Sequence, residues 1–159
     1  FAETEDITRD GIIGNYVHGN EPAHHAAYLY NWTDQPWKTQ PRIRMILNKM
    51  YHQGPAGLGG NDDCGQMSAW YIFSALGFYP VAPASGEYAL GSPAVHGATV
   101  QVGEGKQFII TVNNQSDKNV YVQSARLNGK LLARPFLPVS DVRQGGTLEF
   151  VMGGKPTRQ

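Results

Sequence analysis

The spacing of hydrophobic residues along the chain changes close to residue 80. Before that point, apolar side chains recur every three or four positions, the spacing of a helix that buries one face. Beyond it, apolar and polar residues alternate, as they do in strands with one face on a core. The pattern predicts an α+β protein. Its helical region is expected at residues 1–80 and its antiparallel β region at residues 81–159, divided where prolines and glycines cluster.

Three helices are expected in the first region, at residues 21–30, within residues 33–52 and at residues 66–76. The last of these segments is apolar almost all round, which is typical of a buried helix. Gly77 is expected as the left-handed residue that ends it.

Strands are expected at residues 99–102, 107–112, 119–127 and 147–152. Asn128-Gly129 predicts a tight hairpin turn within this set. Together the strands indicate a small antiparallel sandwich or sheet layer.

Composition narrows the classes of partner. The 159 residues hold 13 basic and 13 acidic side chains, and this balance argues against binding to nucleic acid or to an anionic membrane. No apolar run approaches the roughly 18 residues that span a bilayer. The single Cys64 excludes an internal disulfide and a cysteine-rich zinc site. Residues 1–80 carry all three tryptophans and four of the five histidines, so functional polar chemistry is expected there.

A glycine-rich loop before the third helix is the most distinctive candidate site. Asn61, Asp62 and Asp63 stand on it, directly ahead of the apolar helix. A carboxylate at a helix N-terminus is stabilised in its ionised form, which suits a general base that activates water. Asp63 fits equally well as a helix N-cap, with Gln66 completing a capping box. The spacing leaves both interpretations open.

Residues 18–25 form a second candidate, with a carboxylate, an amide and three imidazoles in the run HGNEPAHH. These groups suit metal ligands, sugar ligands or acid–base groups. Adjacent His24 and His25 point about 100° apart on a helix, so they do not chelate one metal as a pair. The segment fits equally well as a first helical turn with Glu21 in it and its histidines hydrogen-bonded internally.

A third candidate lies at residues 32–40, where Trp32 and Trp37 stand beside amides and Lys38. Aromatic rings pack on the C–H faces of sugars, which favours a carbohydrate-contacting surface. Tryptophan at the entry of a helix is equally often part of a core.

Several segments, taken together and in this order, resemble glycoside hydrolase family 92. They are GNEPAHHAAYLYN at residues 19–31, PWKTQ at 36–40, GNDDCGQMSAW at 60–70, FSALGFYP at 73–80, YALGSP at 88–93 and LNG at 127–129. The resemblance covers nearly the whole chain from about Tyr16 onward.

The resemblance implies a fold and an activity. Members are calcium-dependent, inverting exo-α-mannosidases, many acting on α-1,2-linked mannose of N-glycans, with an N-terminal β-sandwich before an (α/α)6-barrel catalytic domain. The chain is thus similar to a C-terminal fragment of an α-1,2-mannosidase: the last helices of the barrel followed by a small antiparallel β-sandwich or sheet layer. The implied partners are a mannose-containing glycan and the remainder of the parent chain. The implied location is the bacterial periplasm or the exterior of the cell.

The resemblance also implies roles for individual residues. Asp63 matches the family's general base, and Asn61 stands where some members carry a second aspartate beside it. Asn20 and Glu21 match the signature expected to face the Ca²⁺ ion. Substrate contacts are expected from five side chains: Glu21, His24, His25, Trp37 and Lys38. The general acid is expected upstream of Phe1, so the chain alone is expected to be inactive, since an inverting hydrolase needs both an acid and a base.

Two other classes remain open on the sequence. A non-catalytic carbohydrate-binding module would use the tryptophans, and a structural module would bind neither sugar nor calcium. As a fragment of the barrel, the chain is expected to expose apolar surface where the rest of the barrel packed, including part of the helix at residues 66–76, which favours self-association.

Overall fold

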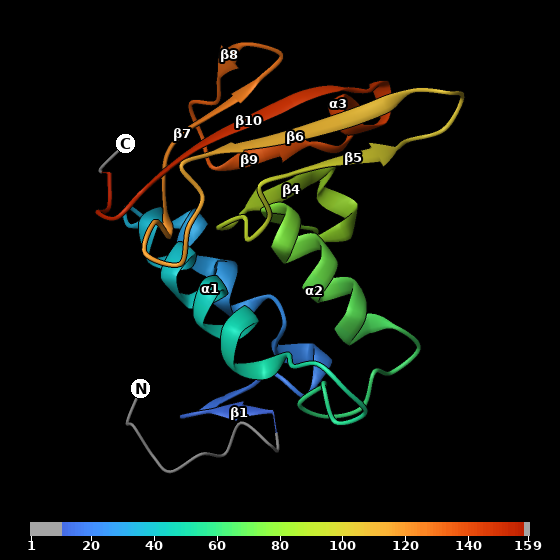
Figure 1. The fold of residues 1–159 in the computed structure, drawn as a ribbon, viewed down its shortest axis with the longest axis vertical. Helices are drawn as coiled ribbons and strands as arrows, with labels where there is room; N and C mark the ends of the chain where they lie inside the picture. The colour runs from blue at the N-terminus through green and yellow to red at the C-terminus, as the bar shows by residue number, and fades with distance from the viewer. Residues whose placement is uncertain (1–10, 158–159) are drawn as a thin grey trace.

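The computed structural model describes residues 11–157 and confirms a mixture of helices and sheets (Figure 1). The elements of the helical half are β1 (Ile12–Ile13), β2 (Tyr16–Val17), η2 (Glu21–Ala23), η3 (Ala26–Trp32), η4 (Pro36–Lys38), α1 (Thr39–Met50) and α2 (Gln66–Leu76). Those that follow are β3 (Phe78–Tyr79), η5 (Pro83–Ser85), β4 (Glu87–Leu90), β5 (Gly97–Gln101), β6 (Gln107–Asn113), β7 (Tyr121–Leu127), β8 (Lys130–Leu131), β9 (Phe136–Pro138), α3 (Val139–Gln144) and β10 (Gly146–Gly153).

The three predicted helices differ in outcome. Helix α2 has the predicted bounds, and Gly77 ends it in the left-handed conformation (φ 101°), donating its N–H to the carbonyls of Phe73 and Ser74. The second helix lies within the predicted residues 33–52, because α1 begins at Thr39 after the separate turn η4 and ends at Met50. The first is not an α-helix, since residues 21–32 form two 3₁₀ helices, η2 and η3, with His24 and His25 between them.

The larger sheet has five strands in the order β5-β6-β10-β7-β8. Its β10 strand pairs antiparallel with β7 but parallel with β6, so the prediction of a purely antiparallel β region is wrong at this pair. Alternation of apolar residues records which face of a strand is buried and carries no information about strand direction. The predicted hairpin is confirmed between β7 and β8, where Asn128 (φ 49°) and Gly129 (φ 81°) both have positive φ, as a type I′ turn requires.

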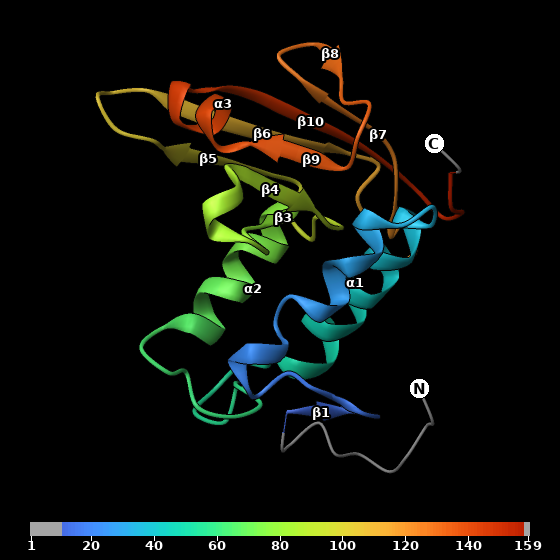
Figure 2. The same ribbon diagram turned by 180° about the vertical axis from the view of Figure 1, so that it is seen from behind.

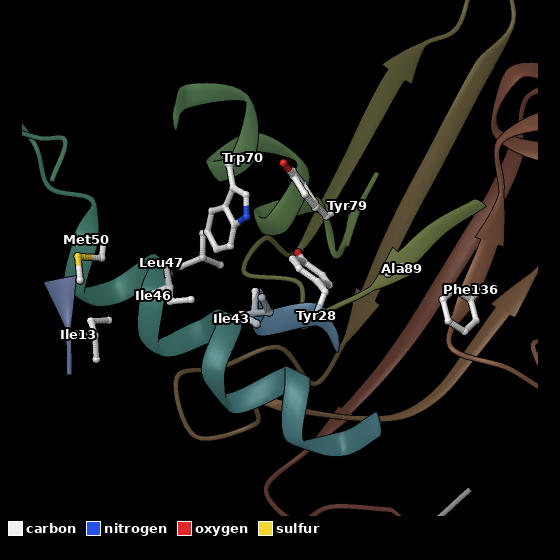
Figure 3. Packing of buried hydrophobic residues seen from close by; sticks show 11 residues of the cluster. Ile13, Tyr28, Ile43, Ile46, Leu47, Met50, Trp70, Tyr79, Ala89 and Phe136 are labelled. Atoms are coloured by element: carbon white, nitrogen blue, oxygen red, sulfur yellow. The ribbon is translucent and has the colours of Figure 1, made fainter. Parts of the chain in front are cut away.

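The smaller sheet, with the order β3-β4-β9, packs against the larger one. One hydrophobic cluster joins them: Phe78, Leu90 and Leu137 from the smaller sheet with Phe108, Ile110, Leu148 and Phe150 from the larger. A second cluster fills the space between α1, α2 and η3, around Tyr28, Ile43 and Trp70 (Figure 3).

Contacts cross residue 80 in both directions. Ala89 and Phe136 belong to the helical cluster, and Phe78 belongs to the cluster between the sheets. The buried Arg44 of α1 donates to the carbonyl oxygens of Pro93 at 2.7 Å and Ser116 at 3.0 Å. The division into residues 1–80 and 81–159 stays a prediction, and these contacts tie its two parts together. Among the described residues, no helix combines the length and the apolar character needed to cross a membrane.

Candidate active site

The two acidic candidate segments meet at the end of the helices that faces away from the sheets (Figures 1 and 2). The loop before α2 packs directly on the backbone before η2: a Cβ atom on Gly60 would lie 2.9 Å from Cα of Gly19, and one on Gly11 2.7 Å from the same atom. Side chains at these positions would push the segments apart. The glycines therefore allow Asn20 and Glu21 to lie beside residues 61–63.

The loop enters α2 through a strained backbone. Asp63 (φ 44°), Cys64 (φ 59°) and Gly65 (φ 90°) are left-handed in succession. Non-glycine residues in this region cost free energy, and such strain gathers at functional sites. Asp63, the first of these residues, is exposed to solvent.

Asp62, not Asp63, caps α2. The Oδ1 atom of Asp62 accepts a hydrogen bond from the Ser68 N–H at 2.9 Å, and the Asp62 carbonyl accepts from Met67 N–H at 3.2 Å. The alternative in which Asp63 is the N-cap and Gln66 completes a capping box is therefore wrong. Asp63 remains exposed, and its carboxyl group takes no part in capping the helix.

The Asp63 and Glu21 carboxyl groups are hydrogen-bonded to each other. This bond and the negative charge of Glu21 raise the pKa of Asp63 above its ordinary value. The backbone N–H of Glu21, and then the bond from Asp63, lower the pKa of Glu21. Two carboxyl groups in contact do not ionise independently, so Glu21 loses its proton more readily than Asp63 does.

Glu21 has an oxygen that is shielded from solvent yet has no hydrogen-bond partner, Oε1. A buried acceptor without a partner is costly, and a hard cation would satisfy it. The exposed Asn20 side chain makes no capping bond to η2, so its amide oxygen is available one residue before Glu21. The described residues contain no group of three or more His, Cys, Asp or Glu side chains suited to a metal, so a cation here would depend on amide, carbonyl or external oxygens as well.

His24 does not contact the open side of the site. It is 2% exposed, its Nε2 donates to the His18 carbonyl at 2.9 Å, and its Nδ1 accepts from the Gln66 amide at 3.2 Å. Burial lowers its pKa, so the ring is neutral. Both ring nitrogens thus have partners inside the protein, and the role of His24 as a substrate contact stays a prediction. His24 is spaced helically with the buried residues Ala27, Tyr28 and Asn31. This spacing could have placed it in the interior.

His25 and Asn61 are exposed and their predicted roles stay predictions.

His18 is the centre of a buried polar network that the sequence did not reveal as such. Tyr16 Oη donates to its Nδ1 at 2.8 Å, and its Nε2 donates to Tyr51 Oη at 2.7 Å, which in turn donates to the Met67 carbonyl at 3.0 Å. Burial, together with the nearby His24, lowers the pKa of His18 to about 3. Tyr51 and Met67 come from distant segments, so only the three-dimensional structure brings the network together.

Trp37 and Lys38 lie at the opposite end of α1 from this site (Figure 1). Helix α1 has 12 residues, about 18 Å of rise, between η4 and the loop at residues 51–65. The Lys38 ammonium stands over the Tyr30 ring, 5.9 Å from its centre. The structure therefore does not bring these two predicted substrate contacts together with Glu21 and Asp63.

Helix α2 leaves apolar side chains exposed, as predicted. Tyr71 and Ile72 are 42% and 57% exposed. They line a hollow of about 620 Å³ together with Tyr51, Pro55 and Leu58. This surface adjoins the loop that leads to Asp63.

Comparisons with known proteins agree on one family. A model of the glycosyl hydrolase family 92 catalytic domain matches residues 1–154. A GH92 α-mannosidase of Bacteroides thetaiotaomicron has a solved structure that is 51% identical, with a TM-score of 0.90, over 94% of this chain and 20% of that one. A second structure from that organism, described as a family GH92 inverting mannosidase, is 44% identical with a TM-score of 0.85, over 92% of this chain and 20% of that one.

A curated relative from Arthroderma benhamiae, described as an uncharacterized secreted glycosidase, is 30% identical over 156 residues, which are 96% of this chain and 20% of that protein. The chain thus spans about one fifth of the length of these relatives. The match to the catalytic-domain model over nearly every residue shows that the chain belongs to glycoside hydrolase family 92.

Proposed function

We propose that this chain is part of a calcium-dependent, inverting exo-α-mannosidase that hydrolyses α-1,2-linked mannose of N-glycans. The observation that carries the proposal is the contact between Glu21 and Asp63 on a strained, solvent-facing loop. It is supported by the similarity to α-mannosidases, one of them described as inverting and one solved in complex with mannoimidazole. The similarity to a secreted glycosidase supports an exported protein.

Asp63 is the general base in this proposal. It is exposed and not needed to cap α2, so an oxygen is available to accept a proton from water. Glu21 is not the matching acid, since the acid and base of inverting glycosidases stand about 6.5–9.5 Å apart to admit the water, whereas these two groups touch. Asn61, two residues before the base, supports it as an auxiliary group.

Asn20 and Glu21 would hold the calcium ion. The unpartnered Oε1 of Glu21 and the paired carboxyl groups fit a hard cation with oxygen ligands. When bound, calcium would supply positive charge that favours ionised carboxylates and binds sugar hydroxyls. Asp63 would then be ionised near neutral pH, as a base must be.

The acid is supplied by the remainder of the parent chain. In this proposal α1 and α2 are the last helices of an (α/α)6 barrel, and the hollow beside Tyr71 and Ile72 receives other helices of that barrel. The 159-residue chain alone is then inactive.

The test compares the 159-residue chain with the longest natural gene product that contains it. Both are assayed for release of mannose from an α-1,2-linked mannobiose, with calcium and with a chelator, while proton NMR follows the anomer formed first. We expect calcium-dependent release of β-mannose by the longer product and none by the chain alone. Release of α-mannose, or release that a chelator leaves unchanged, would contradict the mechanism. Binding of the sugar by both proteins without hydrolysis would favour the carbohydrate-binding alternative.

A further inference from the structure

The segments that carry Glu21 and Asp63 are joined by side-chain hydrogen bonds. His24 ends η2, three residues after Glu21, and Gln66 begins α2, three residues after Asp63. The Gln66 amide donates to Nδ1 of His24 at 3.2 Å and to the Tyr79 hydroxyl at 3.0 Å. The spacing of the two carboxyl groups is therefore coupled to the side chain of Gln66.

Hydrogen-bonding roles give this bridge a single orientation. The His18 carbonyl oxygen accepts only, so Nε2 of His24 carries the hydrogen and Nδ1 is an acceptor. Nδ1 must then face a donor, and the NH₂ group of Gln66 supplies it. The second amide hydrogen goes to Tyr79, so both hydrogens of the amide are used.

A second bond fixes His24 to the same helix. Trp70 of α2 donates its indole Nε1–H to the His24 carbonyl at 3.1 Å, and both residues are buried. His24 is thus held to α2 at two points. Glu21 lies one 3₁₀ turn before His24, so these bonds join the turn that carries Glu21 to helix α2.

We propose that Gln66 is a positioning residue, which holds the Glu21 and Asp63 carboxyl groups together through its bridge to His24 and Tyr79. This role deepens the proposed function and rests on it. Groups that orient metal ligands through hydrogen bonds typically contribute 10- to 100-fold to metal affinity. The Gln66 bridge would have this orienting effect on Glu21 and Asp63.

The start of α2 does not depend on the Gln66 side chain. The backbone N–H groups of Gln66 and Met67 bond to the carbonyls of Asp63 and Asp62, and that of Ser68 bonds to Asp62 Oδ1. A substitution that keeps the length of the Gln66 side chain therefore removes the bridge and leaves the helix end intact.

The experiment uses two variants of Gln66 in the longest natural gene product that contains this chain. Gln66→Met keeps the length and removes both donors. Gln66→Glu restores the link by another route, because a doubly protonated His24 can donate from Nδ1 to the new carboxylate while Nε2 still donates to the His18 carbonyl. Gln144→Met is the matched control, since Gln144 is exposed at the end of α3, far along the chain from the site.

Two readouts are followed in each variant: the ¹⁵N chemical shifts of the His24 ring by NMR, and the dissociation constant for Ca²⁺ by calorimetry. We expect Gln66→Met to shift the Nδ1 signal and to weaken Ca²⁺ binding about 10- to 100-fold. Gln66→Glu should show a protonated Nδ1 at neutral pH and recover most of the affinity. Gln144→Met should match the parent in both readouts.

Three results would overturn the positioning role. They are an unchanged Nδ1 signal in Gln66→Met, an unchanged Ca²⁺ affinity in that variant, and equal losses in the Met and Glu variants. Failure of the proposed function looks different: the unsubstituted full-length product then binds no Ca²⁺, while the Nδ1 signal still reports the bridge. If Gln66→Met does not fold, Gln66→Glu decides the matter through the same two readouts.

Discussion

The two hydrophobic cores of the molecule are built on different principles. Around the helices, polar groups penetrate the interior: the Tyr28 hydroxyl bonds to Ser74 Oγ at 2.8 Å, and the amide of Asn31 donates to the Leu90 carbonyl at 2.7 Å. Of the seven buried polar or charged residues in the described part, six precede residue 80. Between the sheets, the buried cluster is built from aromatic and aliphatic side chains such as Phe108 and Phe150.

The difference indicates a division of tasks. Apolar packing is nondirectional, and it supplies stability roughly in proportion to the area removed from water. Buried hydrogen bonds are directional and specify one arrangement when every partner is satisfied. The helical core therefore fixes the geometry of the site, and the core between the sheets provides much of the stability on which that geometry depends.

The largest effect is expected for the candidate site, when Asp63→Asn is made in the longest natural gene product that contains this chain. If Asp63 is the base, turnover should fall by about 10² to 10⁴, the usual contribution of such a group, with substrate binding largely kept. Steady-state kinetics checks this, with the exposed Asp34→Asn as the control. Near-normal turnover in Asp63→Asn would remove Asp63 from the mechanism.

Substitutions in the core between the sheets should lower the free energy of unfolding. Phe150 is fully buried, so Phe150→Ala should lower the free energy of unfolding by about 3–5 kcal/mol. Ile109, which is 38% exposed on β6, offers the control, because Ile109→Ala removes much less buried surface. Urea unfolding of both variants measures the difference, and equal losses would show that the cluster is less tightly packed than the structure indicates.

Acid should weaken the helical core through His18. Its folded pKa of about 3 lies below the value of 6.5 expected in the unfolded chain. The unfolded chain therefore binds a proton between these values that the folded chain does not. The free energy of unfolding should fall by about 1.4 kcal/mol per unit as the pH drops through this window.

Unfolding curves at a series of pH values measure this slope. The exposed His96→Asn should leave it unchanged, whereas His18→Phe should reduce it while lowering stability at neutral pH, because Tyr16 and Tyr51 lose their partner. Stability that is constant between pH 6.5 and 4 would contradict the depressed pKa of His18.

The smallest expected effect separates the roles of the adjacent residues Asp62 and Asp63. Asp62→Ala removes the cap of α2 and should cost about 1 kcal/mol of stability. Its effect on turnover should be far smaller than that of Asp63→Asn. Thermal unfolding and kinetics on the two variants measure both quantities, and the reverse pattern would exchange the two roles.

Local sequence signals predicted the elements that local chemistry determines. Helix α2 has its predicted bounds because Gly65 and Gly77 flank an apolar segment, and the β7–β8 turn formed where Asn128-Gly129 requires it. The parallel pairing of β6 with β10 could not be predicted, since it depends on which distant strand occupies the centre of the sheet.

The candidate site shows the same limit. Glu21 and Asp63 were each recognisable from their own segments, but their contact depends on close packing of Gly19 against Gly60, which no local pattern reveals. The buried state of His24 was predictable in principle from its helical spacing with Tyr28. The bridge through Gln66 was not, because its acceptors lie 42 and 13 residues away.

The central place of β10 bears on how the protein is made. Strands β6 and β7 both leave the ribosome before β10, and neither has its shared neighbour until residues 146–153 emerge. Until then each strand presents an unpaired edge, the kind of surface that promotes aggregation of nascent chains. Completion of the sheet thus waits for a late translational event, and chaperone protection matters most during the synthesis of the 32 residues between Asn113 and Gly146.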